Sequence, residues 1–234
     1  MVKRVVHGVA AVVLFASWAA AQAGPAGHWE GTTTADGGGQ LVLSLDLSKN
    51  EQSEWVGSMG VPSAKATGLV VQDIVVNGNS VKFTGVELMM ARFDLTLGPD
   101  GKMKGTMANV RMSQPIEFTR TGEAKVELIR PSPAVSKNLE GDWEGVLEVP
   151  GRPMRVALHF KNQPDETVAA TFVNLQMGIG SVPLNDVKQA GQKVEFGLRV
   201  AQSSFEGTLN QDGTELTGTL TNPGGRTPLT LRKK

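Results

Sequence analysis

The sequence predicts an all-β protein that consists of two tandem antiparallel meander β-barrels, or two two-layer sandwiches, after an export signal. Three observations predict this fold. Residues 27–31, which read GHWEG, return as residues 141–145, which read GDWEG, and the later segments follow in the same order at a nearly constant offset. Apolar and polar residues alternate along short runs, and Asp-Gly or Asn-Gly turns separate several of these runs.

The first 23 residues have the organisation of a secretory signal peptide. Lys3 and Arg4 precede an apolar run over residues 5–20, and small residues ending at Ala23 provide a cleavage position. The run is short for a bilayer span, so a retained membrane anchor is the alternative interpretation. The chain contains no cysteine, which excludes a lipidated cysteine and disulfide bonds. We therefore expect a secreted or periplasmic protein that has no membrane contact after signal cleavage.

The first repeat is expected to span residues 24–132. Its clearest strand is residues 41–47, where leucine occupies every second position and therefore points to one face of an extended chain. Asn-Gly at 77–78 and Asp-Gly at 100–101 supply the positive φ angles that tight hairpins need. The pattern predicts seven or eight short strands, and residues 57–68 are expected to form a mobile rim.

The second repeat is expected to span residues 133–234. Residues 154–160 and 194–200 show the same alternation as the first repeat, and Gly105 of the first repeat matches Gly218 of the second. The boundary lies in the proline-containing segment 130–134, because proline cannot occupy a central strand. The segment just before it, residues 124–129, is expected to lengthen the last strand of the first repeat. A single helical turn is expected near residues 136–139.

The charge balance excludes some classes of partner. Removal of the signal peptide leaves 21 basic and 23 acidic residues, so the basic excess that nucleic acids or anionic membranes require is absent. Tyrosine is missing, and tryptophan is rare, which disfavours an aromatic platform for sugars. We expect no nucleic-acid partner. The oligomeric state is left open.

The sequence contains no recognisable catalytic, cofactor or metal motif. No Gly-x-Ser-x-Gly pentapeptide is present, and Ser58 and Ser181 lack the strand-to-helix context of a nucleophile. His28 and His159 do not occupy matching positions in the two repeats, and both are expected to face solvent. We therefore assign no catalytic, cofactor-binding or metal-binding residues and expect a protein that is not an enzyme.

Several segments of the second repeat resemble a β-rich domain that stands ahead of the catalytic domain in secreted bacterial α/β-hydrolases and serine hydrolases. The resemblance extends more loosely to the first repeat, and it implies an accessory role without a catalytic domain in this chain. Most of the matched positions are turn glycines and core residues. The matching segments are residues 141–145, 182–187, 204–209, 212–213, 216–220 and 227–232.

A second resemblance concerns the ends of each repeat. A Gly-x-Trp near the start and a basic residue near the end are similar to the calycins, the lipocalin and fatty-acid-binding barrels, in which a cation packs over the tryptophan at the closed end. The resemblance implies that Trp29 pairs with Arg120 and that Trp143 pairs with Arg232 or Lys233. A cation over an indole contributes about 0.5–2 kcal/mol.

Methionines crowd the later part of the first repeat. Met89, Met103 and Met107 are candidates to line a pocket for apolar ligands, although methionine more often fills irregular gaps in a core. Three functions remain open at this point: a secreted non-enzymatic protein that binds a small apolar ligand inside a barrel, an accessory module that contacts another exported protein through its outer surface, and a hydrolase with an unrecognised site.

Overall fold

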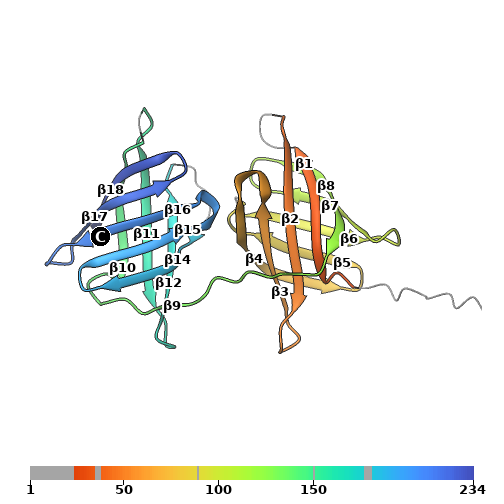
Figure 1. Ribbon diagram of the computed structural model, residues 1–234, viewed down its shortest axis with the longest axis horizontal. Helices are drawn as coiled ribbons and strands as arrows, with labels where there is room; N and C mark the ends of the chain where they lie inside the picture. Colours follow the sequence, from red (N-terminus) through yellow and green to blue (C-terminus); the bar gives the residue numbers. More distant parts are fainter. Residues whose placement is uncertain (1–23, 35–37, 89, 150, 177–180) are drawn as a thin grey trace, which may run out of the picture.

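The computed structural model describes residues 24–34, 38–88, 90–149, 151–176 and 181–234. These residues form two antiparallel β-barrels that lie side by side and are joined by an extended linker (Figure 1). The predicted signal peptide, residues 1–23, lies outside the described residues, as does Met89. Within the described ranges, no helix is long and apolar enough to cross a membrane.

The first barrel is a closed meander of eight strands, in which the last strand pairs with the first. Alternation along the strands turns one set of side chains inward and the other outward, as the leucine pattern predicts. Its strands are β1 (Gly27–Thr34), β2 (Gln40–Lys49), β3 (Trp55–Val61), β4 (Ala66–Asn77), β5 (Ser80–Gly85), β6 (Ala91–Leu97), β7 (Lys102–Ala108) and β8 (Ser113–Gly122).

The second barrel follows the same meander order but is closed less regularly. Between β12 and β14, the short strand β9 pairs with β12, and the Val187 amide of β14 donates to Ser132 Oγ of β9 at 2.9 Å. The strands are β9 (Ser132–Pro133), β10 (Gly141–Leu147), β11 (Met154–Asn162), β12 (Thr167–Asn174), β13 (Val182–Pro183), β14 (Asn185–Ala190), β15 (Lys193–Leu198), β16 (Ser203–Leu209), β17 (Glu215–Asn222) and β18 (Gly225–Lys233).

The boundary expected after residue 132 falls inside β9. Ser132 already belongs to the second barrel, because it pairs with Val168 and accepts the Val187 amide. The first barrel ends at Gly122, so residues 123–131 form the linker between the barrels.

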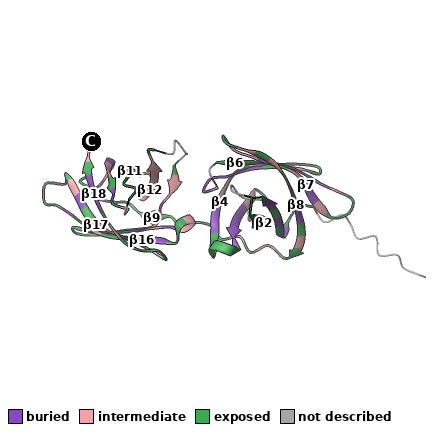
Figure 2. Cartoon of the chain, turned by 90° about the horizontal axis from the view of Figure 1, so that it is seen from above, coloured by how far each residue is buried: buried purple, intermediate pink, exposed green. Residues whose placement is uncertain are grey.

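Each barrel has its own core. Within each core, the inward side chains pack against one another in a similar way. Buried and exposed residues alternate along many strands of both barrels (Figure 2). In the first core, the rings of Phe83 and Phe93 stack with centroids 4.5 Å apart, and in the second, Phe196 and Phe205 stack at 4.6 Å. Leucines and tryptophan occupy much of the remaining interior.

Helical structure among the described residues is limited to two 3₁₀ turns, η1 (Pro62–Ala64) and η2 (Arg199–Ala201). Near residues 136–139, where a single helical turn is expected, the chain makes one turn in which the Leu139 and Glu140 amides both donate to the Ser136 carbonyl at 3.0 Å. The expected rim, residues 57–68, is largely regular structure. Gly57 and Ser58 are buried within β3, and the connection to β4 shortens to η1 and Lys65.

The linker does not lengthen β8, contrary to the expectation for residues 124–129. It crosses the outer wall of the first barrel over β2 and β3 (Figure 1). The Lys125 amide donates to Asp46 Oδ1 at 2.7 Å, and the Glu127 amide donates to Ser58 Oγ at 2.9 Å. Outward side chains of the barrel thus accept hydrogen bonds from every second of these backbone amides of the linker. In a regular sheet, such amides would donate to the backbone of a neighbouring strand.

The two barrels also contact each other directly through η2, which lies against β4. Arg199 donates to the Gly68 carbonyl at 2.7 Å, and Val200 packs against the core of the first barrel. The barrels are therefore held together by the linker and by this contact, which we call the junction.

Candidate functional site

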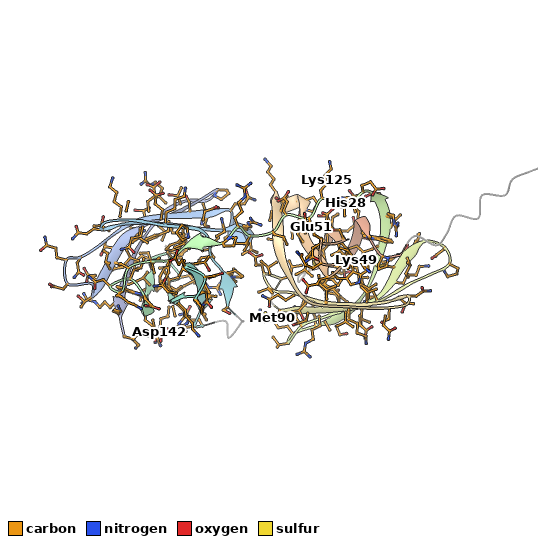
Figure 3. The ribbon with its side chains drawn as sticks, turned by 90° about the horizontal axis from the view of Figure 1, so that it is seen from below. His28, Lys49, Glu51, Met90, Lys125 and Asp142 are labelled. Carbon is orange, nitrogen blue, oxygen red and sulfur yellow. The ribbon has the colours of Figure 1, made fainter. Side chains whose placement is uncertain are left out.

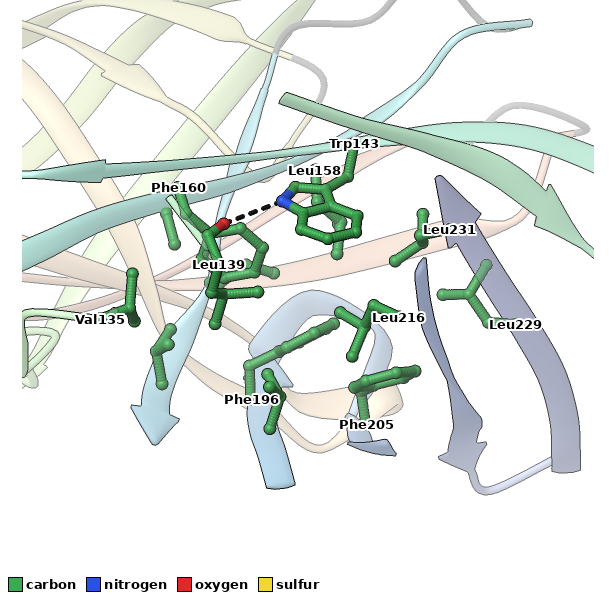
Figure 4. Close-up of a cluster of buried hydrophobic side chains, with 14 of the residues drawn as sticks. Val135, Leu139, Trp143, Leu158, Phe160, Phe196, Phe205, Leu216, Leu229 and Leu231 are labelled. Carbon is green, nitrogen blue, oxygen red and sulfur yellow. Dashed lines mark hydrogen bonds between the residues drawn. The ribbon is translucent and has the colours of Figure 1, made fainter. Parts of the chain in front are cut away.

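The tryptophans lie at the ends of the barrels, each with a cation beside its ring. Trp29 is fully buried and donates to the Pro25 carbonyl at 2.9 Å, and the Arg120 guanidinium lies 4.6 Å from the ring centroid. Trp143 is also fully buried and donates to the Leu139 carbonyl at 2.9 Å (Figure 4). Lys233 Nζ lies 5.6 Å from the Trp143 ring centroid.

Of the two cations considered for Trp143, Arg232 takes a different partner. Lys233 is the residue that pairs with Trp143 across β10 and β18, so both side chains point inward. Arg232 is one residue earlier and therefore points outward, where its guanidinium lies 2.9 Å from Glu215.

Met103 and Met107 are buried members of the first core. Met107 pairs with Phe93 and Met103 with Leu97 across β6 and β7. Both therefore pack within the core of the first barrel.

A cavity of about 420 Å³ lies between the linker and the outer wall of the first barrel, and we call it the linker cavity. Strands β1 to β4 and the end of β8 form its floor, and the start of the linker forms its cover. Its volume falls within the usual range for small-molecule sites. Most of the residues that line it have polar side chains: His28, Ser44, Asp46, Ser58, Met59, Thr67, Gly68, Thr121, Gly122, Glu123, Lys125 and Glu127.

Asp46 connects the cover of the linker cavity to its floor. The linker buries this residue, and its Oδ1 accepts from both the Lys125 amide at 2.7 Å and His28 Nδ1 at 2.8 Å. His28 is only 30% exposed, so the expectation that it faces solvent is wrong. The linker, which crosses this wall, is the reason that an outward histidine becomes half-buried.

The second barrel carries the same pair in reverse order. Asp142 precedes Trp143 where His28 precedes Trp29, and His159 stands opposite Asp142 where Asp46 stands opposite His28. His159 Nδ1 lies 2.7 Å from Asp142 Oδ1. These side chains are 46% and 68% exposed, because no linker covers them. Figure 3 labels His28 on the first barrel, Lys125 on the linker and Asp142 on the second barrel.

The linker cavity lacks the arrangement of a serine nucleophile and its base. Ser58 Oγ is engaged as the acceptor of the Glu127 amide. The second nitrogen of His28 lies 3.8 Å from Glu30, so its nearest recorded polar neighbour is a carboxylate. Across the described ranges, no three histidine, aspartate or glutamate side chains are grouped so that they could hold a metal ion.

A second cavity, of about 280 Å³, lies at the junction, and we call it the junction cavity. Thr67 and Glu127 line both cavities, and Thr67 donates to Glu127 Oε2 at 2.9 Å. Asn185 Oδ1 is buried at this cavity and has no hydrogen-bond partner among the described residues. The full lining is Lys65, Ala66, Thr67, Glu127, Asn185, Leu198, Arg199, Gln202 and Ser203.

Glu87 is a buried carboxylate beside the junction. Burial raises the pKa of Glu87, while the hydrogen bond from the Val70 amide at 2.6 Å and the charge of Arg199 oppose this rise. The Val200 amide of the second barrel also faces the carboxylate. Groups from both barrels therefore stabilise the ionised form of Glu87, whereas the loss of water on burial destabilises this form.

The raised pKa of Glu87 predicts a pH dependence of stability. The folded protein retains this proton to higher pH than the unfolded chain, so the contribution of Glu87 is most favourable below about pH 4.5 and declines as pH rises through the folded pKa. We expect Glu87→Gln to gain stability relative to the wild type as pH rises from about 4 to 8. Urea denaturation of both proteins at each pH measures this difference. A difference that is constant, or that grows toward acid pH, would contradict the prediction.

No protein-family model and no curated protein sequence matches this chain. Two solved structures show a distant likeness. One is a protein of unknown function from the DUF3598 family of Nostoc punctiforme, with 14% identity, a TM-score of 0.28, and coverage of 90% of this chain and 96% of the other. The second, from Bacteroides fragilis, is described as a putative outer membrane protein, with 15% identity, a TM-score of 0.29, and coverage of 89% and 97%. Such low similarity carries no argument about activity.

Sequence reasoning missed most of the residues that form the two cavities. Asp46 and Ser58 lie on the outward face of their strands, where polar residues need no partner, and the linker residues Lys125 and Glu127 follow no motif. One signal was available: histidine and aspartate exchange places between the two repeats at positions that pair across neighbouring strands.

Proposed function

We propose that the protein is an exported, non-enzymatic binding protein that takes a small polar ligand in the linker cavity. The observation that carries this proposal is a cavity of about 420 Å³ in which a buried carboxylate, a half-buried histidine and several hydroxyl and charged groups converge. Such convergence of a few polar groups in a cavity of this size is typical of small-molecule sites.

Three observations favour the outer wall over the barrel interior as the binding site. Stacked phenylalanines, methionines and leucines occupy the interior of the first barrel. The linker cavity has hydrogen-bonding groups on both its floor and its cover. An outer site also suits the accessory role that the hydrolase-associated resemblance implies. Export is inferred from the predicted signal peptide over residues 1–23.

A fragment screen monitored by amide NMR spectra tests the proposed site. We expect polar fragments to shift the amide signals of Lys125 and Glu127, because these amides donate to the wall of the cavity. Asp46→Asn retains an acceptor for the Lys125 amide but removes the charge. Since a hydrogen bond to a charged group contributes about 1.5–3 kcal/mol, this variant should weaken binding by about tenfold or more.

Asp142→Asn is the matched control, because it changes the equivalent pair in the barrel that no linker covers. This variant should bind the same fragments with unchanged affinity. Fragments that shift Met103 and Met107 instead would place the site in the barrel interior and refute the proposal. An absence of any shift at Lys125 and Glu127 across the screen would also refute it.

A further inference from the structure

The linker cavity and the junction cavity are adjacent, because Thr67 and Glu127 line both of them. The hydrogen bond between these two side chains marks the place where the cavities meet. Together, the cavities form a groove that runs beside the linker from His28 to the junction with the second barrel. A ligand that is longer than a single fragment can therefore contact both cavities at once.

The two ends of this groove differ in charge. The linker cavity contains the carboxylates of Asp46, Glu123 and Glu127 and the single lysine Lys125. At the junction, the cations are Lys65 and Arg199. The groove is thus acidic at one end and basic at the other, with Glu127 between them.

Lys65 is available to a ligand at the basic end. No ion pair of Lys65 is recorded within the described ranges, whereas Arg199 already donates to the Gly68 carbonyl. Lys65 also has a positive φ of 51° at the end of η1, a conformation that non-glycine residues seldom adopt. The backbone there holds the lysine at the edge of the junction cavity.

Asn185 supplies an independent indication of a ligand at the junction. Its Nδ2 donates to Asp186 at 2.6 Å, which fixes the orientation of the amide and leaves Oδ1 as a buried acceptor with no partner among the described residues. A buried acceptor without a donor costs about 1–3 kcal/mol. This oxygen has almost no accessible surface, so an N–H group of a ligand in the junction cavity would satisfy it only after the Asn185 side chain turns toward the cavity.

We infer that the groove binds a short peptide with free termini. The peptide ammonium group lies at the acidic end among Asp46, Glu123 and Glu127, and the carboxylate lies beside Lys65 and Arg199. A backbone N–H near the carboxylate donates to Asn185 Oδ1 once the Asn185 side chain has turned toward the junction cavity. This inference rests on the proposed function, because it names the ligand class of the linker cavity and extends the site to the junction.

Titration calorimetry with trialanine and its blocked forms tests the inference. We expect trialanine to bind, and N-acetylation and C-amidation each to weaken binding by about tenfold, because each removes a charge that faces an opposite charge in the groove. Lys65→Ala should weaken trialanine binding and reduce the difference between the acid and the amide, because only Arg199 then faces the carboxylate, while the effect of acetylation remains. Lys161→Ala, which removes an exposed lysine on β11, is the control and should behave as wild type.

The outcomes separate this inference from the proposed function. If polar fragments shift Lys125 and Glu127 but trialanine does not bind, the peptide inference is wrong and the proposed site stands. Equal binding of the free and blocked peptides, or unchanged discrimination in Lys65→Ala, would also overturn the inference. If neither fragments nor peptides perturb the linker cavity, both proposals fail.

Discussion

Replacement of Trp29 by alanine is expected to lower the free energy of unfolding of the first barrel by about 3–5 kcal/mol. The indole is fully buried, so its removal leaves a large hole where β1 meets β8. The change also leaves the Pro25 carbonyl without its donor, and it removes the ring over which Arg120 lies. Urea denaturation followed by circular dichroism measures the loss without relying on tryptophan fluorescence.

Trp55→Ala is the matched control in the same barrel. Trp55 is only partly buried, and Lys49 Nζ lies 5.4 Å from its ring centroid. We therefore expect a loss below about 2 kcal/mol, since less apolar surface leaves the core. Equal losses for the two variants would show that Trp29 has no special part in closing the barrel.

Gly105→Ala is expected to destabilise the first barrel by about 3 kcal/mol. A Cβ built on Gly105 would overlap the carbonyl group of Asp94 and crowd the Cα of Leu95 on the neighbouring strand. These are backbone atoms, so β6 and β7 would have to separate, and no side chain can move aside to relieve the overlap. Thermal and urea unfolding of the variant measure this cost.

Gly39→Ala separates this steric effect from the general effect of replacing a glycine. A Cβ at Gly39 would meet no atom within 4 Å. We expect its stability to remain within about 0.5 kcal/mol of the wild type. A Gly105→Ala variant as stable as Gly39→Ala would mean that the two strands are packed less closely than described.

The glycines show why the fold was predictable from the sequence. Gly105 and Gly218 match between the repeats, and at both positions a Cβ would overlap the carbonyl oxygen of the preceding strand, that of Asp94 or Glu206. A constraint of this kind acts on the same position in both barrels, so it recurs at a fixed offset along the chain. The alternation of apolar residues and the Asp-Gly turns can likewise be read within short stretches of the sequence. The all-β barrel fold predicted from these patterns is confirmed.

The candidate site was not predictable in the same way. Asp46 contacts Lys125 across 79 residues, and Ser58 contacts Glu127 across 69. Nothing in residues 123–131 predicts that they lie across the barrel wall instead of lengthening β8. Because these contacts occur in only one of the two barrels, comparison of the repeats also could not reveal them.

The linker has a consequence for the order in which the protein assembles. Its acceptors, Asp46 and Ser58, stand side by side only when β2 and β3 are paired, and His28 joins them only when β1 is in register. We therefore expect the linker to dock only after these three strands have paired, and the docked linker then limits how the second barrel can lie against the first.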